Sequence, residues 1–127
     1  MMLVVACFGN TADSVTERSA AQVVAVGPVQ ATITAGTLFP DPPKVQVLDQ
    51  YGAPFPGIGV IFEVTAGGGV VTGTDVGYVT RTTVATNLAG VSSVLWQTGG
   101  APGTNTLTAR VGNIAPVVFT ATTTAAP

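Results

Sequence analysis

The sequence contains very few ionised side chains. Lysine, arginine, aspartate and glutamate together make up 8% of its 127 residues, whereas soluble domains usually carry about 25%. The four cations are dispersed along the chain and form no basic patch, so we predict no nucleic-acid partner. Like-charge repulsion helps to keep proteins apart. Because this repulsion is weak here, we expect the chain to work inside an assembly: a homo-oligomer, a polymer, or a capsid or surface lattice.

Histidine is absent and cysteine occurs once, at Cys7. One cysteine cannot form an intramolecular disulfide, and without histidine the commonest metal ligand and general base is missing. Ser92 and Ser93 therefore have no histidine that could activate them in a Ser-His-Asp triad. We predict that the chain is not an enzyme and has no catalytic, cofactor-binding or metal-binding residues.

Long apolar runs are also missing, because no stretch reaches the roughly 18 to 20 residues needed to span a bilayer. The short apolar start admits two interpretations. Val4-Val5-Ala6-Cys7 resembles a lipoprotein cleavage box, with Cys7 as a possible lipid attachment site and the only route to a membrane, but no basic residue precedes it. Alternatively, the start is an apolar arm that packs on a neighbouring subunit. The assembly segment would then consist of Met1, Met2, Leu3, Val4, Val5 and Phe8.

What the sequence does contain is a succession of short runs rich in Val, Thr, Ile and Phe, separated by Gly, Pro, Asn and Asp. Their spacing of about 8 to 12 residues is typical of β-sandwiches. We expect residues 1–21 to form an apolar arm, or truncated signal, plus a polar linker, and residues 22–127 to form one sandwich domain. The predicted strands are 22–26, 29–35, 44–48, 58–65, 78–86, 91–97, 104–111 and 117–123.

Alternation with period 2 predicts which side chains of these strands face the interior. The resulting core comprises Val45, Val47, Val60, Phe62, Val64, Val94, Trp96, Leu107 and Phe119. Trp96 is the only tryptophan, and we expect it to be buried with its N–H bonded to a backbone carbonyl rather than exposed as a sugar-stacking platform. Asp49 begins the turn Asp49-Gln50-Tyr51-Gly52, in which its side chain can bond its own backbone.

The segments KVQVLDQYGAPFPGIGVIFEVTAGGG, TVATNLAG and FTAT carry a resemblance to a known family. They are similar to the bacterial immunoglobulin-like repeats of the invasin and intimin type, over about residues 32–124. The resemblance implies an immunoglobulin-like antiparallel β-sandwich of about 7 to 8 strands, used outside the cell as a spacer, adhesive or structural unit, with no catalytic residues to transfer. The matching positions are Val45, Val47, Asp49, Gly52, Pro54, Gly57, Val60, Phe62, Gly67, Gly68, Gly69, Thr86, Gly90, Phe119, Thr120, Ala121 and Thr122.

The sequence gives little support for three more specific sites: a phosphate-binding loop, a calcium site and an amide cross-link. The glycine-rich segment 67–73 lacks the Lys-Ser/Thr and the following helix of a phosphate-binding loop, so a strand exit is the better interpretation. Asp41, Asp49 and Asp75 are scattered and do not form a calcium loop. Lys44 and Glu63 could be considered for an amide cross-link, but Glu63 is expected to face outward and Lys44 to protect a strand edge.

These observations favour a non-enzymatic structural subunit of an extracellular or cell-surface assembly. The subunit would self-associate through the N-terminal arm and through sheet edges, as in a filament, or decorate a virion surface. The alternative is a lipid-anchored adhesin that recognises a host or glycan ligand through loops 53–57 and 99–103.

Overall fold

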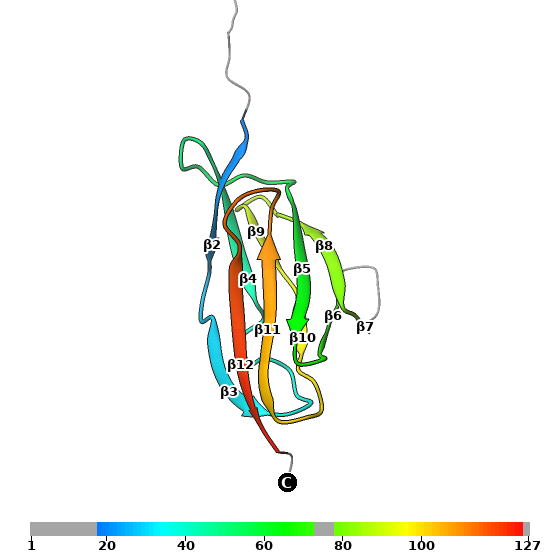
Figure 1. Ribbon diagram of the computed structural model, residues 1–127. Coiled ribbons are helices and arrows are strands. Elements are labelled where there is room, and N and C mark those ends of the chain that lie inside the picture. Colours follow the sequence, from blue (N-terminus) through cyan, green and yellow to red (C-terminus); the bar gives the residue numbers. More distant parts are fainter. Residues whose placement is uncertain (1–17, 73–77, 126–127) are drawn as a thin grey trace, which may run out of the picture.

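The computed structural model describes residues 18–72 and 78–125, and these residues form β-strands and loops with no helix (Figure 1). Eleven strands build the sandwich, so the predicted all-β fold class is confirmed. The number exceeds the predicted 7 to 8 because two expected strands are each divided in two and one short strand was not expected. Together the strands form two layers around one core.

One layer is a five-stranded sheet with the order β3-β12-β11-β5-β8. Its neighbouring strands are antiparallel except for β3 and β12, which are parallel. The parallel pair arises because the chain passes from β2 in the other layer into β3 through Gly27-Pro28 without reversing its direction (Figure 1). The bounds are β3 Gln30–Thr34, β5 Gly59–Ala66, β8 Arg81–Ala85, β11 Gly103–Arg110 and β12 Val117–Thr124.

The second layer consists of two three-stranded sheets, β2-β4-β9 and β10-β6-β7. The predicted strand 91–97 is divided at the buried Val94, whose N–H donates to the carbonyl of Pro43, so that β9 and β10 join different sheets. The predicted strand 78–86 is divided at Thr80. The unexpected strand is β6, which follows the three glycines at once. The bounds are β2 Ala20–Ala25, β4 Lys44–Asp49, β6 Val70–Thr72, β7 Tyr78–Val79, β9 Val91–Ser93 and β10 Leu95–Gln97.

The core lies between the layers and follows the alternation of the strands. Of the predicted core residues, all are buried except Val64, which is partly buried and packs against the cluster. Trp96 is fully buried and stacks on Phe39 with ring centroids 5.1 Å apart. The expected bond from its indole N–H is not formed, since no described residue accepts it.

The sandwich has two distinct ends (Figure 1). We call the end that holds the start of β2 and loops 50–58, 86–90 and 111–116 the N-terminal end. The opposite end, which holds the end of β12 and loops 35–43, 67–69 and 98–102, is the C-terminal end. The first and last described strands therefore leave the body in opposite directions.

Candidate functional site

The predicted assembly segment (Met1, Met2, Leu3, Val4, Val5 and Phe8) and Cys7 lie outside the described residues. The described residues begin with Arg18, which lies in the predicted polar linker. Strand β2 begins at Ala20, two residues before the predicted strand. The surfaces available for function are therefore the two ends, the sheet edges and the outer faces of the layers.

Arg18 attaches the start of the chain to the N-terminal end of the sandwich. Its Nε donates to Asp49 Oδ2 at 2.8 Å, and its Nη2 donates to the carbonyl of Pro54 at 2.7 Å. The guanidinium also lies over the ring of Phe55, with Cζ 4.3 Å from the centroid, a geometry in which a cation is attracted to the ring face. These three contacts hold the first described residue against the N-terminal end of the sandwich.

Asp49 organises the turn that Arg18 contacts. Its Oδ1 accepts hydrogen bonds from the backbone N–H of Tyr51 and of Ala53, as predicted for this turn. The pKa of Asp49 lies below its ordinary value, chiefly because the Ala53 N–H stabilises the ionised form and also because Arg18 and the Tyr51 N–H do so, while burial acts in the opposite direction. The carboxylate thus remains ionised although it is buried.

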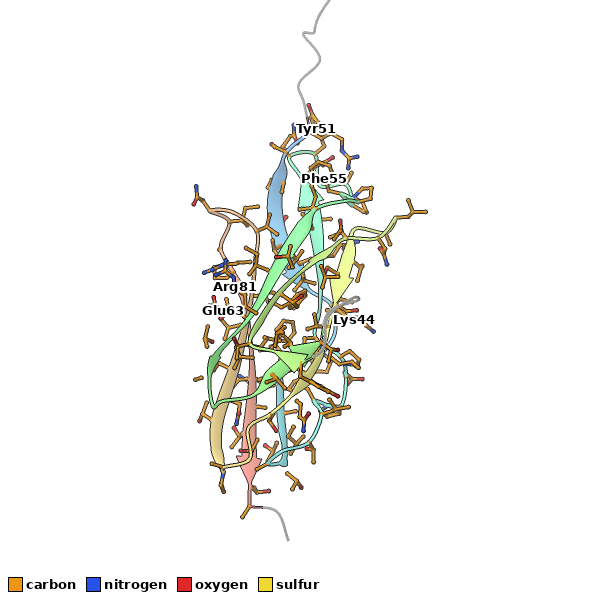
Figure 2. The ribbon with its side chains drawn as sticks, turned by 90° about the vertical axis from the view of Figure 1, so that its right-hand side faces the viewer. Lys44, Tyr51, Phe55, Glu63 and Arg81 are labelled. Carbon is orange, nitrogen blue, oxygen red and sulfur yellow. The ribbon has the colours of Figure 1, made fainter. Side chains whose placement is uncertain are left out.

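Thr86 joins the same loop to loop 86–90. Its Oγ1 donates to the carbonyl of Phe55 at 2.6 Å and accepts from the N–H of Ile58 at 2.9 Å. A Cβ added at Gly90 would meet the backbone nitrogen of Phe55 at 2.8 Å, so this glycine lets the two loops pack closely. Tyr51 and Phe55 consequently lie at the N-terminal end of the molecule (Figure 2).

At the C-terminal end, the loops are held by Asn105 and by close contacts between glycines, rather than by an ion pair such as Asp49–Arg18. Asn105 is 1% exposed, and its Oδ1 accepts from the N–H of Gly99 at 3.0 Å, while its Nδ2 donates to Thr123 Oγ1 at 3.3 Å. A Cβ at Gly99 would collide with the carbonyl oxygen of Gly67. The predicted strand exit at residues 67–69 is therefore a closely packed crossing of two loops.

The edges of the sandwich differ in charge. Strands β2 and β3 are the last strands of their sheets and lie on the same side of the molecule (Figure 1). No ionised residue occurs in the sequence between Arg18 and Asp41, so this edge carries none of the charges that usually discourage edge pairing. The edge strand β8, by contrast, carries the exposed Arg81.

The outer face of the five-stranded sheet is rich in threonine. Thr104, Thr106, Thr120 and Thr122 lie opposite one another across β11 and β12, and a shallow groove lies where β12 meets β3. Glu63 is on this face, as predicted, and is half-buried beside Arg110 with Oε1 3.3 Å from Nη2. The face offers hydroxyl groups but few ionised groups.

The residues considered from sequence for an amide cross-link and for a calcium site are not brought together. Glu63 lies beside Arg81 on one side of the molecule, whereas Lys44 lies on the other (Figure 2). Asp41 is exposed, Asp49 is bonded within its own turn and Asp75 lies outside the described residues. In the described part of the chain no three Asp, Glu, Cys or His residues are grouped so that they could hold a metal ion. No helix in residues 18–72 or 78–125 could cross a membrane.

Sequence reasoning missed two features that could have been found. Arg18 is the last ionised residue before a long uncharged stretch, which marks it as the end of the linker. Leu95 lies between Val94 and Trp96, so the alternation that places its two neighbours inward also places Leu95 outward. The sequence therefore indicates that Leu95 is an exposed apolar side chain on the outer face of its strand, as the structure shows.

Comparison with solved structures shows where this fold occurs. Domains 4 and 5 of the S-layer protein SbsC are similar with a TM-score of 0.60 and 16% identity, over 96% of this chain and 57% of that one. A structure of SbsC domains 4–9 is similar with a TM-score of 0.60 and 18% identity, over 87% of this chain and 15% of that one. The D00-D0 domain of intimin gives a TM-score of 0.48 and 13% identity, over 90% of this chain and 53% of that one.

The chain thus shares its fold with part of a longer surface-layer protein and spans 57% or less of the length of each of these three structures. No protein-family model matches the sequence, and no curated protein matches it either. The likeness establishes the fold as one that also occurs in domains of an S-layer protein.

Proposed function

We propose that this chain is a non-enzymatic structural module of an extracellular or cell-surface assembly. It associates with further copies of itself through the N-terminal arm, residues 1–8, and through its sheet edges. The fold supports this proposal because similar domains belong to a protein whose name describes it as an S-layer protein. The small number of ionised side chains supports it as well, because repulsion between copies is weak.

The observation that carries the proposal is the uncharged edge formed by β2 and β3. An edge strand presents unpaired backbone N–H and C=O groups on its free side, and proteins that remain separate usually protect such strands with Lys, Pro or a bulge. Strands β2 and β3 contain no charged residue and no proline. The register shift of β2 lies at its start, between Ala20 and Gln22, and the pairing from Gln22 to Ala25 is regular. Addition of a strand from another chain would satisfy these backbone groups directly.

The opposite positions of the two ends also suit a structural module. A domain whose chain enters at one end and leaves at the other can be placed in series without folding back (Figure 1). At the C-terminal end, Gly99 lets two loops cross with close backbone contact.

Sedimentation velocity of the full chain over a wide concentration range, with negative-stain imaging, tests the proposal. We expect concentration-dependent oligomers that change little with salt, because the contacts are made by backbone and apolar groups rather than by charges. The double variant Gln22→Lys and Thr32→Lys places charges at two exposed positions of the β2–β3 edge and should reduce assembly.

Thr83→Lys with Ala85→Lys is the matched control, since it adds the same charge at two exposed positions of the β8 edge. It should leave assembly largely unchanged. A wild-type chain that remains a monomer at high concentration would contradict the proposal and would favour an adhesive module. Equal effects of the two double variants would show that total charge, rather than the β2–β3 edge, controls association.

A further inference from the structure

The outer face of sheet β10-β6-β7 carries an apolar patch. In register across the three strands, Leu95 lies opposite Thr72, and Thr72 lies opposite Tyr78. The next row has Gln97 at its centre. Val70 lies opposite Gln97 on one side, and Leu38 forms an isolated bridge with Gln97 on the other side. Residues directly opposite each other on neighbouring strands point to the same face. We define the apolar patch as Leu38, Val70, Thr72, Tyr78, Leu95 and Gln97.

The alternation of these strands shows that the patch faces away from the core. Val71 and Trp96, which lie between patch residues in sequence, are both fully buried. Leu38, Leu95 and Tyr78 are 47%, 44% and 59% exposed, and they account for three of the seven large exposed hydrophobic residues of the described chain. Such a concentration on one face is typical of an interaction surface.

The patch contains no ionised group that an apolar partner would bury, and its polar groups are the hydroxyls of Thr72 and Tyr78 and the Gln97 amide. None of the six residues is ionised, and the Gln97 amide already donates to the carbonyl of Gly36 at 3.1 Å. Covering this surface would therefore leave no buried charge without a partner. The chemistry of the patch selects an uncharged, apolar segment.

Residues 1–8 of this chain match that chemistry, since they contain six large apolar side chains and no ionised one. We propose that the apolar patch of one copy receives residues 1–8 of a second copy. This inference rests on the proposed function, because it names the surface to which the N-terminal arm binds during self-association. No other surface of the described chain brings three large exposed apolar side chains into neighbouring rows of one sheet.

The positions of Arg18 and of the apolar patch favour a second copy over the same copy. Arg18 holds the chain at the N-terminal end, whereas the patch adjoins the C-terminal end, where Leu38 lies in loop 35–43 (Figure 1). The ten residues from 8 to 18 can span at most about 33 to 36 Å. In copies stacked end to end, the N-terminal end of one copy would adjoin the C-terminal end of the next, beside which the patch lies, whereas within one copy the same segment would have to run back along the sandwich.

The contact is heterologous, because each copy gives an arm and receives one through a different surface. Such contacts generate either closed rings or open filaments, depending on the rotation between copies. An assembly of these copies can therefore grow in one direction through the arm contact and sideways through the β2–β3 edge.

The single cysteine of the chain provides a direct test. Cys7 lies within the arm, so the full-length variant Leu95→Cys places one new thiol in the proposed receiving surface. Under mild oxidation we expect a reducible ladder of dimers and larger multimers, in which mass spectrometry finds Cys7 linked to position 95. Val118→Cys is the matched control, because Val118 is 47% exposed on the outer face of the other layer. It should give no link between Cys7 and position 118.

Other cross-linking patterns would overturn the inference. A monomer with a link between Cys7 and position 95 would show that the arm covers the patch of its own copy. Links between two Cys7 residues alone, equally frequent in both variants, would show that the arm does not reach the patch.

A mixing experiment separates this inference from the proposed function. One variant, Leu3→Asp with Val5→Asp, damages the arm, and the other, Leu38→Ser with Leu95→Thr, damages the receiving patch. Each alone should show at least tenfold weaker end-to-end association in sedimentation velocity, and a mixture should form heterodimers through the remaining intact arm and patch. Val118→Thr should behave as the wild type.

If the patch variant assembles as strongly as the wild type, the inference fails and the proposed function stands. If the wild type does not assemble at any concentration, the proposed function fails and the inference fails with it. The two failures are therefore distinguishable in one series of measurements.

Discussion

The loops at the two ends of the sandwich are held together by different kinds of side chain. Each end contains one buried polar side chain that bonds to loop backbone: Asp49 at the N-terminal end and Asn105 at the C-terminal end. Asp49 is ionised and is paired with Arg18, whereas Asn105 is neutral and is surrounded by glycines at 67 and 99. The structure of one end therefore depends on charge, and that of the other end depends on the absence of side chains.

This difference agrees with the proposed roles of the ends. At the N-terminal end, Arg18 connects the body to residues that lead to the arm, and this connection can be loosened by protonation or by loss of one side chain. At the C-terminal end, the loop crossing depends on close backbone approach, and it should not respond to pH. Four predictions test this distinction. Fluorescence of the single, buried Trp96 reports unfolding in each case.

The largest effect is expected for Gly99→Ala at the C-terminal end. Its Cβ would collide with the backbone carbonyl of Gly67, which cannot move aside as a flexible side chain could. We expect the free energy of unfolding to fall by about 3 kcal/mol or more. Gly100→Ala is the control, because a Cβ there meets nothing within 4 Å. Equal losses in denaturant titrations of the two variants would contradict the close-packing argument.

Asn105→Ala should be the next most damaging change. It removes the acceptor for the buried Gly99 N–H and the donor to Thr123 Oγ1. An unpaired buried backbone group and a lost side chain together should cost about 2 to 3 kcal/mol. The loss should be the same at pH 3 and pH 7. The exposed Asn113→Ala should stay within about 0.5 kcal/mol of the wild type, and a pH-dependent loss in Asn105→Ala would contradict the assigned neutral role.

Asp49→Asn should change the response to acid. The pKa of Asp49 in the folded state lies below its ordinary value of 3.8, chiefly because of the Ala53 N–H. Its contribution to stability is therefore complete above that ordinary value and is lost as the pH falls through the lower folded-state pKa. Asp49→Asn should lower stability at pH 7 and flatten this decline between neutral pH and strongly acidic pH. The exposed Asp41→Asn should keep the wild-type profile, and a profile of Asp49→Asn as steep as the wild type would reject the assignment.

Arg18→Lys should have the smallest effect. Lysine keeps the charge but cannot bond Asp49 and the Pro54 carbonyl with a planar group while lying over Phe55. We expect a loss of about 0.5 to 1 kcal/mol, because Arg18 is partly exposed and its ion pair is screened by solvent. Arg81→Lys on the β8 edge should cost less than about 0.5 kcal/mol. A larger loss of unfolding free energy for Arg81→Lys than for Arg18→Lys would contradict the stabilising role assigned to the Arg18 contacts.

Much of the fold could be predicted because alternation and turn residues act locally. Val60 and Phe62 face the core, and Asp49 bonds its own turn, as their sequence positions indicate. The division of strand 91–97 could not be predicted, because its first half pairs with β4 and its second half with β6, two strands that are distant in sequence. Strand β6 escaped prediction for a related reason: it is three residues long, and its pairing with β10 rather than its composition defines it.

The surfaces were less accessible to sequence reasoning than the core. The absence of charge between Arg18 and Asp41 was visible, but its significance depends on β2 and β3 both being edge strands on one side. Leu38 could not be joined to Leu95 and Tyr78, because only the register across β10, β6 and β7 brings the three into neighbouring rows. Local patterns give the direction of a side chain, whereas tertiary pairing decides its neighbours.

The parallel pairing of β3 with β12 has a mechanical consequence. The chain enters at one end of the sandwich and leaves at the other, and five residues of β3 lie in register with five of β12. A force that stretches the molecule between its two ends would pull these strands past each other along their length. The hydrogen bonds between them would then be loaded in shear, all at once, rather than opened one after another, and such an arrangement resists tension.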